Sequence, residues 1–364
     1  MMRSTRPIVQ PALCAMAALA LVPFALIGCD RAAESPTSSQ PAQTVTLYTS
    51  VDDEFAKMVV EAFTEETGIK VHVLGDTEAT KTTGLVTRIQ AEMDHPSADV
   101  WWSSEPMGTI LLAKDGALEA GAMRGMVPEG WPDTLHAPDW SWVGMAMRAR
   151  VIVYASDRVE NPPTTLAQLT DPAYKGVVGM ARPQFGTTRI HMAMLGDTWG
   201  IDGLTSWLQA MKANKLRLYD GNATVVQAVA MGEIDLALTD TDDVWSGQRN
   251  GWKVELAYET ASEDDAGPWP SSGPTLIPNT VAIIKDAPNP ELAAQLARFL
   301  VSPKVEELLY QSTTHNTPVH PALRERYRAE HADLLDIDGL PDYIGASDMV
   351  PEAMEQCETV LEGP

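Results

Sequence analysis

The sequence predicts an α/β fold with mostly parallel β-sheets that carry helices on both faces. Two observations lead to this prediction: short β-rich runs alternate with helical hydrophobic patterns, and a glycine or a polar cluster separates one element from the next. A third observation is size, because the chain has 364 residues, of which 45% are hydrophobic. That is enough for about two domains with hydrophobic cores of their own.

The first β-α-β unit begins with the β-rich run Val45–Tyr48. A helical pattern follows, in which Val59 and Phe63 lie about one turn apart. Gly68 ends this helix before a second strand over residues 69–73. Further strands, each next to a helical pattern, are expected over residues 98–102, 177–180 and 234–238. This alternation favours parallel strands joined by helices.

Residues 1–28 resemble a bacterial export signal. Arg3 and Arg6 precede a long apolar stretch that two prolines interrupt. The stretch ends in Leu-Ile-Gly-Cys, which resembles a lipobox and implies cleavage before Cys29 and lipidation of that cysteine. A transmembrane anchor is the alternative, although the span is barely long enough. Residues 29–43 are rich in Ser, Pro, Ala and Gln, so we expect a disordered tether.

The chain is strongly acidic, with 50 Asp or Glu residues, 26 Lys or Arg residues and a net charge of −24. Because a phosphate backbone repels such a chain, the composition argues against a nucleic-acid partner. Of the three cysteines, Cys14 lies in the signal and Cys29 would be lipidated, which leaves Cys357 as a free thiol. The fold must therefore be stable without an intramolecular disulfide.

Polar residues at the carboxyl ends of strands are the candidate ligand contacts, because ligands bind there in sheets of this kind. Gly186, Thr187, Thr188 and Arg189 open a predicted helix. Glycine allows close backbone approach, hydroxyls donate hydrogen bonds, and the helix dipole favours negative charge, so this segment suits an anion or a carboxylate. An ordinary threonine cap is the alternative. Asn222, at the start of a later helix, allows the same two interpretations.

An acidic cluster follows another strand and consists of Asp240, Asp242 and Asp243. These carboxylates repel one another unless a hard cation, a ligand amine or several N–H donors compensate. The spacing does not match an EF-hand loop. It does resemble the nucleophile motif of haloacid-dehalogenase-type phosphatases, with Asp240 as the nucleophile; a solvated turn without function is a third interpretation. Trp245, just beyond the cluster, suits a cation–π contact with a ligand amine.

The order of several short motifs resembles the ferric-iron and thiamine branch of ABC-transporter solute-binding proteins. The motifs occupy residues 47–50, 98–102, 212–214, 221–222, 232–233, 278–282 and 300–303. The resemblance implies a type II periplasmic-binding fold, in which two doubly wound lobes are joined by crossover strands that act as hinges. We expect those strands near residues 145–151 and 273–283, lobe 1 over residues 44–147 plus 278–364, and lobe 2 over residues 148–277.

The resemblance also implies the ligand contacts. Iron-binding members present two adjacent tyrosines at the positions of Asp242 and Asp243, whereas this chain has no Tyr-Tyr pair. The metal ligands implied here are Asp52, Glu105, Asp242 and Asp243. The full set of expected ligand contacts consists of these four residues together with Ser50, Gly186, Thr187, Thr188, Arg189, Asn222, Asp240 and Trp245.

The expected function is that of a membrane-anchored receptor of an ABC importer, which captures a small solute by hinge closure. Carboxylates are hard donors, so the solute would be Fe³⁺ or a divalent cation together with an anion. An organic amine with an acidic group, such as an aminophosphonate or a thiamine-like compound, is the alternative. We expect a monomer outside the cytoplasm that is not an enzyme, and whose partners are a permease and a cytoplasmic ATPase.

Overall fold

The computed structural model describes residues 43–76, 82–261, 267–271, 273–328, 334–337 and 339–363. The expected signal over residues 1–28, the lipidation site Cys29 and all of the tether except Gln43 lie outside the described residues. Among the helices that are described, none is both long enough and apolar enough to cross a membrane.

The strands of the described residues form one mixed sheet in the order β2-β1-β3-β9-β4-β7-β5-β6, with β8 also paired to β4. Their bounds are β1 Thr44–Thr49, β2 Lys70–Gly75, β3 Val100–Ser103, β4 Trp142–Ala155, β5 Val178–Ala181, β6 Arg217–Tyr219, β7 Leu236–Asp240, β8 Val254–Ala257 and β9 Leu276–Ile283.

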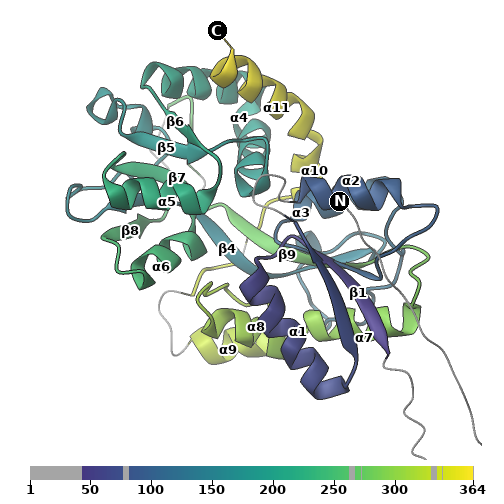
Figure 1. Ribbon diagram of the computed structural model, residues 1–364. Coiled ribbons are helices and arrows are strands. Elements are labelled where there is room, and N and C mark those ends of the chain that lie inside the picture. The colour runs from purple at the N-terminus through teal and green to yellow at the C-terminus, as the bar shows by residue number, and fades with distance from the viewer. Residues whose placement is uncertain are drawn as a thin grey trace, which may run out of the picture. The chain divides into compact units, whose positions relative to one another are not determined.

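Two groups of parallel strands lie at opposite ends of this sheet. The first group is β2, β1 and β3, and the second is β7, β5 and β6. The long strands β4 and β9 run between the groups and pair antiparallel with each other and with their neighbours (Figure 1). The predicted α/β fold is confirmed, and the crossover strands occur where the sequence placed them.

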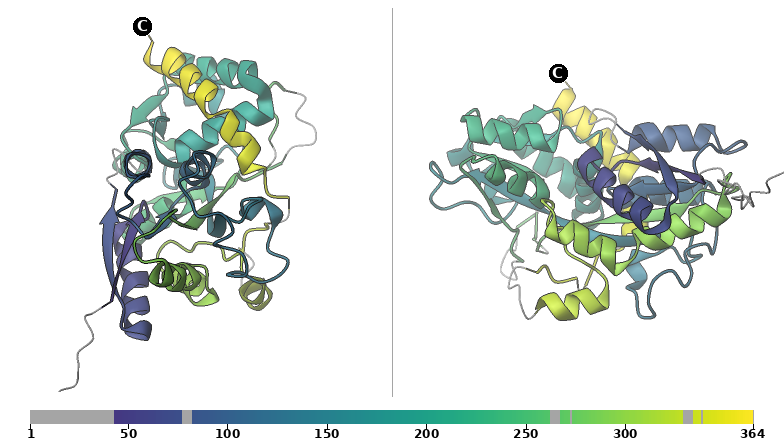
Figure 2. Two further views of the ribbon diagram at one scale, coloured as in Figure 1. Left: turned by 90° about the vertical axis from the view of Figure 1, so that its right-hand side faces the viewer. Right: turned by 60° about the horizontal axis from the view of Figure 1, so that its bottom comes forward.

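Helices alternate with the strands and pack against them (Figure 2). For example, α7 contacts β1 and β9, while α5 contacts β5 and β7. The main helices are α1 Asp53–Thr67, α2 Thr83–Ala91, α3 Pro106–Lys114, α4 Gly186–Ala213, α5 Asn222–Met231, α6 Thr241–Arg249, α7 Pro290–Leu300, α8 Pro303–Gln311, α9 Pro321–Arg328, α10 Tyr343–Asp348 and α11 Val350–Cys357.

The C-terminal helices α10 and α11 fall within residues 278–364, the range expected for part of lobe 1. Helix α11 packs along α4, next to the second group, and α10 contacts both α3 and α4. Gly196 of α4 faces Ala353 of α11, and a Cβ on Gly196 would lie at an ordinary contact distance of 3.8 Å from the Cβ of Ala353. Cys357 is 1% exposed in this interface, and burial raises the pKa of its thiol to about 12. The division of the chain into lobes stays a prediction.

A β-bulge interrupts β4 at Ala146, which has a φ of +38°. The buried carboxylate of Glu306 in α8 accepts a hydrogen bond from the Ala146 N–H at 2.9 Å. It also accepts N–H bonds from Val319 at 3.1 Å and His320 at 2.7 Å. Burial raises the pKa of Glu306 to about 7, although these hydrogen bonds oppose the shift. The Glu306 carboxylate thus holds the backbone of β4 in place at Ala146, two residues before Arg148.

Candidate functional site

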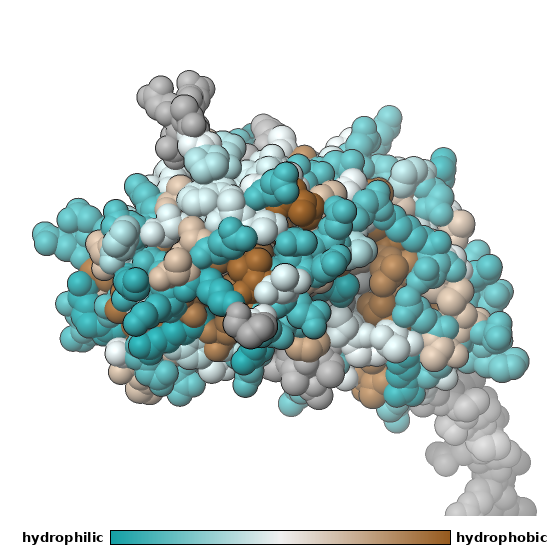
Figure 3. Space-filling view, turned by 90° about the horizontal axis from the view of Figure 1, so that it is seen from above, coloured by the Kyte–Doolittle hydropathy of each residue, from teal (hydrophilic) through white to brown (hydrophobic). Residues whose placement is uncertain are grey.

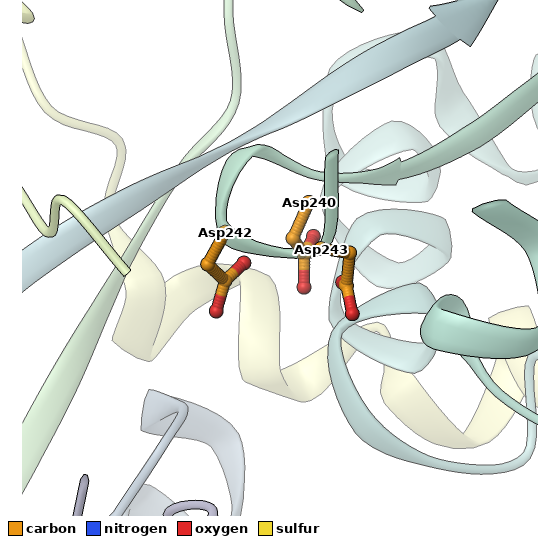
Figure 4. Close-up of side chains that lie close together, drawn as sticks. All are labelled: Asp240, Asp242 and Asp243. Carbon is orange, nitrogen blue, oxygen red and sulfur yellow. The ribbon is translucent and has the colours of Figure 1, made fainter. Parts of the chain in front are cut away.

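The acidic cluster lies where β7 meets α6. Asp240 ends β7, and Asp242 and Asp243 lie in the first turn of α6. One carboxylate oxygen from each residue lies within 4.8 Å of the others, and the three side chains project toward a common space (Figure 4). The positive end of the α6 dipole partly offsets their repulsion. The local sequence therefore concentrates negative charge at one point of the sheet edge.

Two buried arginines from β4 compensate part of this charge. Arg150 lies opposite Asp240 in the antiparallel register, and its Nη1 lies 2.8 Å from Oδ1 of that carboxylate. Nε of Arg148 lies 3.3 Å from Asp240 Oδ2 and 3.7 Å from Asp242 Oδ2. Arg148 also donates to the Ser104 carbonyl at 2.6 Å. Buried charges are stable only when paired in this way.

Neutral donors complete the surroundings of Asp240. Thr187 Oγ1 donates to its Oδ2 at 2.6 Å, and Asn222 Nδ2 donates to the same oxygen at 3.0 Å. Burial alone would raise the pKa of Asp240, but the charges of Arg150 and Arg148 outweigh burial, so the pKa lies below its ordinary value. The carboxylate therefore stays ionised and is held from several sides.

Two helix N-termini border the same space. The N-cap residues of α4 and α5 are Phe185 and Gly221, and neither provides a side-chain cap. Gly186, the first residue of α4, has a φ of +56°, a conformation that favours glycine. N–H groups in the first turn of a helix have no partner within the helix, and they attract negatively charged oxygens.

These elements enclose a small cavity with a volume of about 90 Å³, which we call the solute cavity. Its lining residues carry five aspartate charges and two arginine charges, a formal total of −3. The lining consists of Asp52, Ser104, Arg148, Ala181, Arg182, Phe185, Gly186, Thr187, Thr188, Asp220, Gly221, Asn222, Ala223, Asp240, Asp242 and Asp243. A space that combines carboxylates with helix N-termini suits a cation, alone or together with an anion.

Eight of the residues predicted from the sequence line the solute cavity. They are Asp52, Gly186, Thr187, Thr188, Asn222, Asp240, Asp242 and Asp243.

Four other candidates, Ser50, Glu105, Arg189 and Trp245, are not among its lining residues. The carboxylate of Glu105 is buried and caps α3, where it accepts N–H bonds from Met107 at 2.5 Å and Gly108 at 3.0 Å. Burial raises the pKa of Glu105, and these two bonds oppose the shift. The Ser50 hydroxyl accepts from the Ser104 N–H at 3.0 Å. We therefore leave Glu105 and Ser50 out of the proposed site.

The remaining two candidates lie elsewhere. Arg189 lines a second, larger cavity. The Trp245 ring packs edge-on against the His315 ring, with 5.2 Å between their centroids. Thr188 and Arg189 are adjacent in sequence, but successive helical residues point in different directions, so only the first of them reaches the solute cavity.

Sequence reasoning missed the two arginines that pair with Asp240. A usable signal was present, because Arg148 and Arg150 lie two residues apart within the predicted crossover strand over residues 145–151. Side chains at this spacing share one face of a strand. Both are buried, with 6% and 3% of the residue exposed, so each needs a buried anion beside it.

Comparison with known proteins gives a consistent picture. The family model described as bacterial extracellular solute-binding protein matches residues 58–332. Iron uptake protein A1 from Synechocystis sp. is 27% identical over 296 residues, which are 79% of each chain. The Fe(3+)-binding periplasmic protein from Serratia marcescens is 30% identical over 200 residues, 53% of this chain and 55% of its own length.

Solved structures show the same fold. Iron-bound HitA from Pseudomonas aeruginosa aligns with a TM-score of 0.69 and 22% identity, over 87% of this chain and 99% of its own. The Trichodesmium protein in complex with iron and citrate ligands aligns with a TM-score of 0.68 and 20% identity, over the same shares of the two chains. The architecture is therefore that of type II periplasmic binding proteins.

Proposed function

Because this chain belongs to the bacterial extracellular solute-binding protein family, we propose that its cargo is ferric iron. The iron would bind in the solute cavity and pass to a membrane permease driven by a cytoplasmic ATPase. Relatives named as iron uptake or ferric iron-binding proteins support this assignment. Lipidation of Cys29 would hold the receptor at the outer side of a membrane, and closure about β4 and β9 would enclose the cargo.

The observation that carries the proposal is the cluster of carboxylate oxygens from Asp240, Asp242 and Asp243 within 4.8 Å of one another. Ferric iron is a hard cation and prefers oxygen donors of this kind. Asp242, Asp243 and Asp52 are the proposed ligands, since all three line the cavity. The three carboxylates of these proposed ligands carry a formal charge of −3, which is equal and opposite to the charge of one ferric ion.

Asp240 has a different role in this proposal. Its carboxylate already accepts hydrogen bonds from Arg150, Thr187 and Asn222. Of these three side chains, Thr187 and Asn222 are among those on which the sequence predicted an external anion. We infer that Asp240 occupies that position as a built-in anion, so that iron binds without a second, external one.

Native mass spectrometry with elemental analysis tests the identity of the cargo. Protein purified from iron-replete cells is expected to carry one iron per chain and to lose it on treatment with a strong chelator. An organic mass in place of iron would support the alternative solute, a small amine with an acidic group whose acidic end contacts the N–H groups of α4. Protein that carries neither and takes up no added iron would contradict the proposal.

The built-in anion is tested separately. The apparent affinity for iron, supplied as ferric nitrilotriacetate, should change by less than about threefold when phosphate or carbonate is added. In Asp240→Asn the negative charge is lost, so added anion should now strengthen binding by about tenfold or more. If the unmodified protein required added anion, Asp240 would not have this role, although iron could still be the cargo.

The phosphatase alternative needs a free Asp240 oxygen to attack phosphorus. Both oxygens of Asp240 accept hydrogen bonds from buried donors, which disfavours that role. A magnesium-dependent phosphatase assay separates the two functions: the receptor proposal expects no turnover. Turnover that disappears in Asp240→Asn would favour the enzyme.

A further inference from the structure

A second cavity, with a volume of about 430 Å³, shares no lining residue with the solute cavity. It lies between α2, α3, the first turn of α4 and the junction of α10 with α11. Figure 3 views the molecule from above, where brown hydrophobic patches lie within a mostly hydrophilic surface. The volume falls within the range of small-molecule sites.

One side of the second cavity is apolar. Val86 and Met107 are buried there, while Leu111 is 40% exposed and Val350 is 8% exposed. The side chain of Thr82 packs closely over the α3 backbone at this point, because a Cβ on Gly108 would lie 2.5 Å from the Thr82 methyl carbon. The hydrocarbon part of a ligand would find contacts along this wall.

Two buried polar atoms of the lining residues have no hydrogen-bond partner. One is Oγ1 of Thr82, a residue that is 3% exposed, and the other is Nε of Arg189. Buried polar groups are almost always satisfied, and an unsatisfied one destabilises the fold. Thr82 also has a φ of +71°, an uncommon conformation for a β-branched residue. Each of these donors would be satisfied by an acceptor oxygen of a bound ligand.

The charges in the second cavity select the type of acceptor. Lys114 Nζ is already paired with Asp348 at 2.6 Å and with the Ser347 hydroxyl at 2.7 Å. Arg189 makes no such short contact among the described side chains, but its charge also acts on the buried Glu105 carboxylate, where it opposes the rise in pKa. Two cations and one anion line the cavity, a formal charge of +1, in a chain whose net charge is −24. A monoanion neutralises this charge, and a guanidinium group matches the geometry of a carboxylate.

We propose that the second cavity binds a small carboxylate with an apolar body, whose carboxylate contacts Arg189 and Thr82 and whose hydrocarbon part lies against Val86, Met107 and Leu111. This site is separate from the proposed iron site and does not depend on iron as the cargo.

Isothermal titration of the purified protein with octanoate tests the proposal. We expect saturable binding of about one octanoate per chain, about threefold weaker for each methylene removed. Octylammonium has the same hydrocarbon part and the opposite charge, and it should bind at least about tenfold more weakly. Absence of octanoate binding at millimolar concentration, or equal binding of octylammonium, would overturn the proposal.

Variants locate the binding site. Arg189→Gln should weaken octanoate binding about tenfold or more, while Arg189→Lys should keep most of it. Leu111→Asp places a negative charge on the apolar wall at a position 40% exposed, so it should abolish binding without unfolding the chain. The matched control is Met231→Asp, which lies outside the cavity and is 63% exposed. Unchanged octanoate binding in Leu111→Asp would contradict the site, whatever the result for iron.

Discussion

The carboxylate of Asp240 accepts a 2.8 Å hydrogen bond from the guanidinium of Arg150, at a position where the two side chains are 3% and 2% exposed. This pair joins β7 to β4 at the edge of the solute cavity. It also explains how a cluster of three aspartates is stable within a fold that already carries a net charge of −24. All three aspartates line the cavity, but only Asp240 is paired with both arginines.

The Asp240→Asn variant should be less stable than the unmodified protein by about 3 kcal/mol, because it removes the carboxylate that pairs with the buried Arg150 and leaves Arg148 only its 3.7 Å pairing with Asp242. Urea unfolding measures this difference. Asp220→Asn is the matched control, since Asp220 lines the same cavity but its side chain is 91% exposed; its effect should stay within about 0.5 kcal/mol. Equal stability of the two variants would contradict the buried pairing.

Replacing both Asp242 and Asp243 with Asn should change the free energy of unfolding by less than about 1 kcal/mol. The change removes repulsion between neighbouring carboxylates, but it also removes the 3.7 Å pairing of Asp242 with Arg148 and weakens the bond that Asp243 accepts from Thr239. Thermal unfolding of the iron-free protein checks this balance. A large loss of stability would mean that these carboxylates mainly support the fold.

The pH dependence of stability should contain a contribution from Glu306. Its pKa is about 7 in the folded protein against an ordinary value of 4.5, so folding favours the protonated form. This contribution is fully present below about pH 4.5 and is lost as the pH rises through 7, with a total change of about 3 kcal/mol.

Glu306→Gln cannot ionise, so its stability relative to the unmodified protein should rise by most of that amount between pH 5 and pH 8. Urea unfolding of both proteins across this range gives the comparison. Parallel profiles would show that Glu306 does not titrate in the folded state.

Iron-loaded protein should lack the strong visible absorption of iron–phenolate complexes, because no tyrosine is among the residues that line the solute cavity. Absorption spectra recorded during loading provide the measurement. An intense visible band would place a tyrosine on the metal and would contradict a carboxylate site.

Much of the fold could be predicted from the sequence because the hydrophobic patterns are local. The strands that begin at Thr44, Val100, Val178 and Leu236 agree with the expected runs. The packing of α11 on α4 was not predicted, because an amphipathic helix specifies which of its faces is buried but not which partner covers it.

The candidate site was predicted in part for a similar reason. Asp240, at the end of β7, and Thr187, in the first turn of the helix that follows β5, come together because these parallel strands bring their carboxyl ends to one edge. Glu105 also follows a strand end, yet its carboxylate accepts hydrogen bonds from backbone N–H groups of the helix that it caps. The partnership of Asp240 with Arg148 and Arg150 depends on antiparallel register between distant strands, which the sequence does not specify.

The most direct test of the central claim is a titration of ferric nitrilotriacetate into the iron-free protein and into the variant in which Asp242 and Asp243 are both Asn. The account predicts one ferric ion per chain in the unmodified protein and at least about a hundredfold weaker binding in the variant. Iron binding of equal strength in both proteins, or none in either, would contradict it.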